Sequence, residues 1–198
     1  MKMRASAILA PLVLAAGSVT AAAPTWTPYT AASDGFTISF PGRPAMHSAP
    51  SAQTLDGVYR TYEKDVGDAA YVASVYHFKP GTTPEASTKN YAALLKAYAA
   101  GAKCALKPSH AVTIAGVLAL EATCIDRPGK TDHLMDVLIS GDFLYLIVAA
   151  GNPGFAKSAA ATRFRSTFAL LPVPSAAPPA TTAPAPTLAP AASPSPSP

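Results

Sequence analysis

Two acidic residues, Glu121 and Asp136, come nearest to a chemical site in this sequence. A turn centred on Pro128-Gly129 would pair them directly across two antiparallel strands. A second two-residue turn, at Gly141-Asp142, would bring Tyr145 onto the same face of the sheet. Two facing carboxylates can hold a cation or ligand between them, or work as an acid/base pair. We therefore take Glu121, Asp136 and Tyr145 as candidate ligand-binding residues, and we assign no catalytic residue.

A purely structural interpretation of the two acids stays open. Like charges directly opposite one another destabilise a sheet and raise the pKa of one acid. A β-bulge or a slipped register would separate the acids, and a cation such as Arg60 would neutralise them. One residue of slip reverses the face on which a strand residue lies, so the sheet register decides whether the acids meet.

Other residue types offer little chemistry. The histidines, at positions 47, 77, 110 and 133, are far apart and lack the spacing of metal ligands. The sequence also lacks a glycine-rich phosphate loop, a Gly-x-Ser-x-Gly elbow and a His-Glu-x-x-His motif. We therefore expect no metal site and no cofactor.

Cys104 and Cys124 are the only cysteines in the chain. In an oxidising compartment they are expected to form a disulfide, which would close a loop of about 20 residues. Two buried thiols or a reactive pair are the alternatives. The spacing differs from Cys-x-x-Cys, which argues against a redox enzyme.

Hydrophobic periodicity predicts one α+β domain built on an antiparallel β-sheet with helices packed on it. A first helix is expected to begin at Thr82 or Thr83 and to end at Gly101, with an apolar stripe that includes Tyr91 and Tyr98. The expected strands are 36–40, 58–63, 70–78, 117–126, 131–140 and 143–150, and the expected last helix is 155–168. The face of the last three strands that includes Leu118, opposite the face of the two acids, is expected to be core.

Both ends of the chain carry compositional signals. Residues 1–22 have a basic start and an apolar stretch and read as a cleaved signal peptide, so no stable membrane insertion is expected afterwards. A lead-in (23–33) would precede the domain (34–171). The last segment, 172–198, is uncharged and holds ten prolines; we expect a disordered coil of polyproline-II character.

The charge balance gives no sign of nucleic acid binding. Removal of Lys2 and Arg4 with the signal peptide lowers the Lys and Arg count from 15 to 13, against 11 acidic residues. The remaining basic residues are scattered along the sequence, so we expect no nucleic acid partner.

Three segments resemble a loose family of exported bacterial domains of unknown function. They are Asp34-Gly-Phe-Thr-Ile-Ser-Phe-Pro-Gly-Arg-Pro44, Leu144-Tyr-Leu-Ile-Val-Ala-Ala-Gly151 and Ala161-Thr-Arg-Phe-Arg-Ser-Thr-Phe-Ala-Leu170. The layout is also similar to the sandwich of the extrinsic photosystem II protein, the PsbP-like fold, with α/β/α layers. This resemblance implies a fold and a partner-binding role, and it carries over no catalytic residue.

These observations favour an exported, non-enzymatic binding domain whose partner is an envelope protein or a cell-wall component. One alternative is a small periplasmic hydrolase that uses Glu121 and Asp136 as an acid/base pair. Another is a wall-associated spacer protein in which the tail matters most. An open cleft around the acids would favour the hydrolase, and a helix-covered, arginine-paired arrangement would favour binding.

Overall fold

A computed structural model describes residues 24–126 and 129–172. The expected signal peptide, 1–22, lies outside the described residues, as does the expected tail beyond Pro172.

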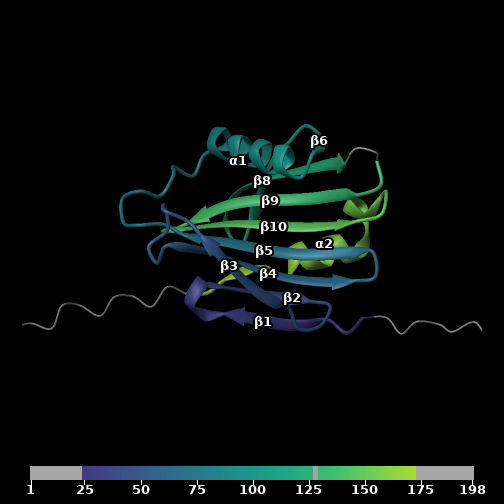
Figure 1. The fold of residues 1–198 in the computed structure, drawn as a ribbon, viewed down its shortest axis with the longest axis horizontal. Helices are drawn as coiled ribbons and strands as arrows, with labels where there is room; N and C mark the ends of the chain where they lie inside the picture. The colour runs from purple at the N-terminus through teal and green to yellow at the C-terminus, as the bar shows by residue number, and fades with distance from the viewer. Residues whose placement is uncertain (1–23, 127–128, 173–198) are drawn as a thin grey trace, which may run out of the picture.

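A large antiparallel sheet forms the centre of the fold (Figure 1). Its strands follow the order β3-β4-β5-β10-β9-β8-β6, and β7 pairs with β8. Their bounds are β3 (Ala45–Pro50), β4 (Val58–Val66), β5 (Ala69–His77), β6 (Cys104–Leu106), β7 (His110–Ile114), β8 (Val117–Asp126), β9 (Asp132–Ser140) and β10 (Phe143–Gly151). The predicted strands 36–40 and 117–126 are confirmed to the residue, and the others agree to within a few residues.

A second, three-stranded sheet was not foreseen. It consists of β1 (Thr27–Ala31), β2 (Phe36–Phe40) and β11 (Ala169–Leu170), with β2 in the middle. Part of the expected lead-in, 23–33, is therefore a strand. The prediction of a single sheet was wrong because β1 and β11 are short and carry no strict alternation of apolar and polar residues.

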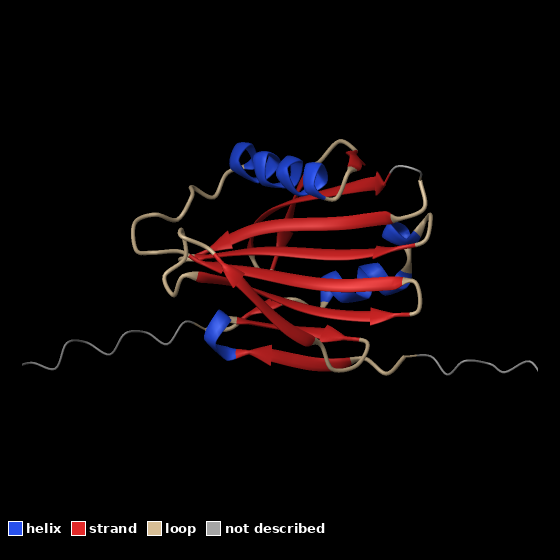
Figure 2. Cartoon of the chain, in the orientation of Figure 1, coloured by secondary structure: helices blue, strands red, loops and turns tan. Residues whose placement is uncertain are grey.

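The described residues include two α-helices and two short 3-10 helices besides the sheets (Figure 2). The α-helices are α1 (Thr88–Gly101) and α2 (Ala159–Ser166), and the 3-10 helices are η1 (Ala32–Asp34) and η2 (Phe155–Lys157). Helix α1 packs on one face of the large sheet, while α2 and the small sheet pack on the other. The expected helix-on-sheet architecture holds in outline, with sheets as the larger part.

The sheet register agrees with the register expected from the turns. Glu121 pairs with Asp136 across β8 and β9, and Asp136 pairs with Ile147 across β9 and β10. Gly129 and Gly141 both have positive φ, of 84° and 56°. Glycine adopts such angles without a Cβ clash, so each turn can reverse the chain where the sequence indicated.

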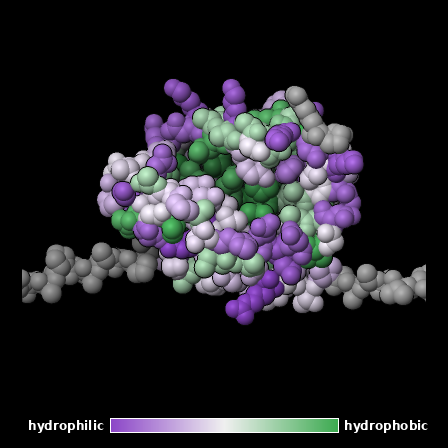
Figure 3. Space-filling view, in the orientation of Figure 1, coloured by the Kyte–Doolittle hydropathy of each residue, from purple (hydrophilic) through white to green (hydrophobic). Residues whose placement is uncertain are grey.

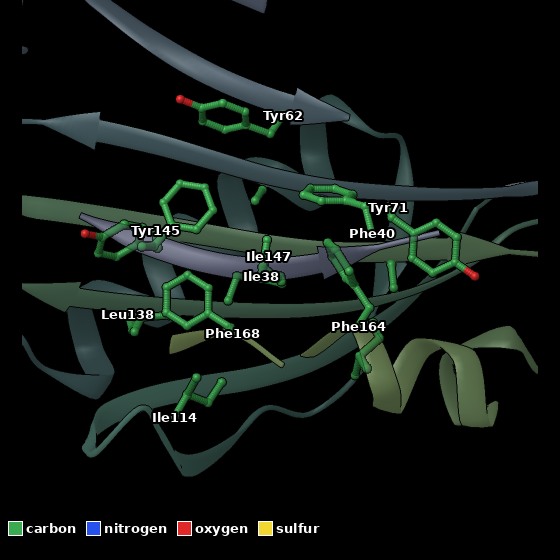
Figure 4. Close-up of a cluster of buried hydrophobic side chains, with 14 of the residues drawn as sticks. Ile38, Phe40, Tyr62, Tyr71, Ile114, Leu138, Tyr145, Ile147, Phe164 and Phe168 are labelled. Atoms are coloured by element: carbon green, nitrogen blue, oxygen red, sulfur yellow. The ribbon is translucent and has the colours of Figure 1, made fainter. Parts of the chain in front are cut away.

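Two hydrophobic cores lie on the two faces of the large sheet. Figure 4 shows the first core, where Phe40 of β2 and Phe164 of α2 pack with ring centroids 5.1 Å apart. The second core lies under α1, where Tyr91 and Leu95 are fully buried, as their helical spacing predicted. Leu118, expected in that core, is 41% exposed because it precedes the first residue of β8 that pairs with β9.

The start predicted for the first helix was wrong. The hydroxyl of Thr82 donates to the carbonyl of Lys79, and that of Thr83 donates to Asp142. Both threonines therefore stabilise the loop that precedes α1. Ser87 caps α1 instead, and its side chain accepts from the backbone amide of Asn90.

The predicted last helix, 155–168, is two helices. Ser158 lies between η2 and α2 in an extended conformation, with ψ of 156°. Its hydroxyl accepts from the amide of Ala161 and so caps α2. The break leaves α2 with eight residues.

The expected disulfide is present between Cys104 of β6 and Cys124 of β8, whose Cα atoms are 5.6 Å apart. It closes a loop with a sequence separation of 20 residues and ties the edge strand β6 to the sheet after α1. The chain-entropy relation for such a loop gives about 3 kcal/mol of stabilisation.

We expect the double variant Cys104→Ser, Cys124→Ser to unfold with a free energy about 3 kcal/mol below that of the oxidised wild type. Denaturant titrations, followed by circular dichroism, measure this difference. Reduced wild type is the matched control, since it should show nearly the same loss. Equal stability of oxidised and reduced wild type would contradict the expected role of the bridge.

Candidate functional site

The predicted acid pair lies on the face of the large sheet that α2 covers. Asp136 is 1% exposed, while the side chain of Glu121 is 14% exposed. Arg165 of α2 forms an ion pair with Oε2 of Glu121, and its Nη1 atom lies 3.9 Å from Oδ1 of Asp136. From the edge strand β7, Nε2 of His110 lies 3.1 Å from Oε1 of Glu121. One cation from a helix and one imidazole therefore face the two carboxylates.

Asp136 is poorly satisfied in this setting. Among the described residues, no group donates a hydrogen bond to either of its carboxyl oxygens. Burial raises the pKa of Asp136 to about 7, because the buried environment disfavours its charged form. This acid can therefore take up or release a proton near neutral pH.

The arrangement is closed to a substrate. A pocket of about 220 Å³ lies beside Arg165, but neither acid lines it. The acids are covered and paired with an arginine, which is the arrangement that favours binding over hydrolysis. A role of Glu121 and Asp136 in binding a ligand stays a prediction.

Tyr145 lies on the same face but interacts with a different group. Its hydroxyl donates to the backbone oxygen of Asp34, at 2.9 Å. The buried carboxylate of Asp34 accepts from Arg60 at 3.1 Å and also from Tyr62. Arg60 thus forms ion pairs with Asp34 and Asp56 rather than with the acid pair. These contacts fasten η1, and with it the small sheet, to the large sheet.

Sequence reasoning missed an apolar groove between α1 and the large sheet. Figure 3 shows it as a hydrophobic hollow beside more polar surface. We call it the α1 groove; its volume is about 390 Å³, and it is lined by Gln53, Tyr76, Phe78, Leu94, Ala97, Tyr98, Val137, Leu144 and Leu146. None of these side chains carries a charge.

The groove exists because α1 covers only part of its sheet face. The helix packs against β6, β8 and β9, whereas β10 and β5 lie further across the same sheet. Leu144 and Leu146 of β10 both lie on this face, because every second residue of a strand points to the same side. On α1, Tyr91 and Leu95 form the buried part of the apolar stripe, and Leu94 and Tyr98 lie beside them, partly buried. Their helical spacing identified the stripe but did not show that its flank stays partly exposed.

Aromatic rings stand along the β5 side of the groove. Tyr76 stacks on Tyr59 with ring centroids 4.8 Å apart and planes at 12°. Phe78 continues the row, 6.4 Å from Tyr76 and at 21°. Across the groove, the Tyr98 hydroxyl lies 3.4 Å from Nδ1 of His133. Burial lowers the pKa of His133, which favours the uncharged imidazole beside Tyr98.

Comparison with known proteins supports the fold and goes no further. The structure is similar to the solution structure of cyanobacterial PsbP (CyanoP) from Synechocystis sp. PCC 6803, with a TM-score of 0.53 and 12% sequence identity. The match covers 80% of this chain and 98% of that chain. No family model matches the sequence, and no curated protein matches it. The chain thus has a PsbP-like fold, as its layout indicated.

Among the described residues, no helix has the length and apolar character needed to cross a membrane.

Proposed function

We propose that this chain is an exported, non-enzymatic binding domain that recognises a component of the cell envelope through the α1 groove. The observation that carries the proposal is the groove itself, an uncharged hollow of about 390 Å³ with aromatic and aliphatic walls. Concave apolar sites with a few polar groups are typical ligand-binding sites. Gln53 and the hydroxyls of Tyr76 and Tyr98 are the polar groups available here.

The state of the acid pair supports the same proposal. A hydrolase would need its substrate to reach Asp136, which is 1% exposed and lies beneath Arg165. The groove, in contrast, requires no displacement of an ion pair to accept a ligand. The envelope as the location rests on the signal-like start and the disulfide, because disulfides persist in oxidising compartments.

We expect a charge in the α1 groove to abolish partner binding. The variant Leu146→Lys puts an ammonium group among the apolar groove residues, where desolvation of a charge is costly. The measurement immobilises the chain and compares the envelope components retained from a detergent-solubilised extract. Wild type should retain a component that Leu146→Lys loses by tenfold or more.

Two matched controls make this experiment specific. Leu118→Lys adds the same charge on β8 at an exposed leucine outside the groove, and Glu121→Gln alters the acid pair. Both should retain the same component as wild type. Loss with Glu121→Gln but not with Leu146→Lys would contradict the groove as the binding surface. Thermal unfolding of each variant shows whether it is folded.

A further inference from the structure

We propose that the proline-rich tail of this chain, residues 173–198, docks reversibly in the α1 groove and competes there with the external partner. This inference rests on the α1 groove being the binding surface of the proposed function. It names the occupant of that groove when no partner is present.

The first argument is chemical complementarity. Proline-rich segments in the polyproline-II conformation dock into grooves lined by aromatic rings, and they lose little conformational entropy on docking. The α1 groove offers Tyr76 and Phe78 on the β5 side and Tyr98 on α1. The groove residues and the tail alike carry no charged side chain, so docking desolvates no ion.

The second argument is where the described chain ends. Leu171 and Pro172 line a separate pocket of about 550 Å³ together with His77 and Phe143. His77 pairs with Phe143, where β5 ends and β10 begins. The next residues along those strands, Phe78 and Leu144, already line the α1 groove. Pro172, the last described residue, therefore lies near the end of β5 and the start of β10, on the face of the large sheet opposite the groove.

The third argument is length. A polyproline-II segment extends about 3.1 Å per residue, so a stretch of five residues such as 173–177 is long enough to reach about 16 Å. A sheet layer is about 10 Å thick, so these five residues suffice to pass from one face to the other. The proline-dense part that follows, 178–190, is then in position to lie along the groove.

Because the tail is covalently attached to the domain, a weak affinity for the α1 groove is sufficient for docking. A short tether gives an effective concentration of about 1 mM. A tail segment with an intrinsic dissociation constant of about 1 mM would then be docked in about half of the molecules. A half-occupied groove binds an external partner about twofold more weakly, so deletion of the tail should strengthen partner binding about twofold.

The test compares ¹⁵N-labelled chains 24–198 and 24–172 by NMR. We expect tail deletion to shift the amide signals of groove residues, among them Leu94, Tyr98, Leu144 and Leu146, and to leave α2 unchanged. A full-length variant in which Pro178, Pro179, Pro184 and Pro186 are replaced by serine should give the groove spectrum of the truncated chain. A synthetic peptide of residues 173–198, added at millimolar concentration to chain 24–172, should restore the full-length shifts.

Three outcomes would overturn the proposal. Shifts confined to Leu171 and its neighbours would show that the tail leaves the groove empty. Groove shifts that disappear on dilution would assign the occupant to the tail of a second copy. A serine variant with the wild-type spectrum would remove proline as the recognised feature. Loss of envelope capture with Leu146→Lys tests the proposed function separately, so that function can survive a failure of tail docking.

Discussion

Replacing Arg165 by methionine is expected to lower the free energy of unfolding by about 3 kcal/mol at pH 8. The substitution keeps much of the aliphatic side chain but removes the cation that faces Glu121 and Asp136. Two carboxylates then remain opposite one another on β8 and β9, and Asp136 is 1% exposed. An unpaired buried charge is costly because neither water nor a counter-ion compensates it. Urea titrations at pH 8 measure the loss.

Arg163→Met is the matched control, since Arg163 lies two residues earlier on the same helix. Its guanidinium lies 5.1 Å from the ring centroid of Trp26, a cation–π contact on the surface. We expect this variant to lose about 1 kcal/mol or less. In an Asp136→Asn background, the loss from Arg165→Met should also shrink to about 1 kcal/mol, because only one carboxylate remains. Equal losses for both arginine variants would show that Arg165 stabilises α2 through packing alone.

Asp136→Asn is expected to stabilise the domain at pH 8 and to flatten its pH dependence. Burial raises the pKa of Asp136 to about 7, against an ordinary value near 4 in the unfolded chain. Between these values the folded state binds more protons than the unfolded state, so stability falls as the pH rises. For one such group, the fall between pH 5 and pH 8 amounts to about 2 to 3 kcal/mol.

The measurement is the free energy of unfolding at pH 5, 6, 7 and 8 for wild type and Asp136→Asn. The two curves should converge toward pH 5 and separate toward pH 8, with the variant above. Asp65→Asn, at an exposed position near the end of β4, is the control and should leave the wild-type profile unchanged. A variant that is less stable than wild type at pH 8 would instead indicate that the charged form of Asp136 holds a cation or ligand.

The register of the acid pair could be predicted from the sequence because local rules determine it. Each turn has a glycine at a positive φ, and each flanking strand is long enough to fix which residues face each other. Once the turns are known, strand alternation places Glu121, Asp136 and Tyr145 on one face.

The partner of the acid pair could not be predicted in this way. Arg165 lies about thirty residues after Asp136, in a helix whose approach depends on the break at Ser158. Arg60 was the arginine considered from the sequence, but Asp34 and Asp56 hold it. Long-range packing determines which of the two arginines pairs with Glu121 and Asp136, and no local sequence pattern predicts it.

The α1 groove was missed for a related reason. Helical spacing identifies the side of α1 that faces the sheet. The part of the sheet face that α1 leaves uncovered depends instead on how many strands the sheet has. The short edge strand β6 positions α1 toward one side of that sheet. Three residues such as Cys104–Leu106 carry too little periodicity to be recognised as a strand.

The small sheet also determines when this domain can finish folding. Its central strand β2 pairs with β1 just before it and with β11 more than a hundred residues later, through Thr37 and Ala169. At 5 to 20 residues per second, a ribosome makes β11 on the order of ten seconds after β2. During that interval, the hairpin of β1 and β2 also lacks Phe164 and Phe168 to pack against, and an isolated hairpin is marginal in water. The growing chain therefore cannot complete this core until α2 and β11 have been made.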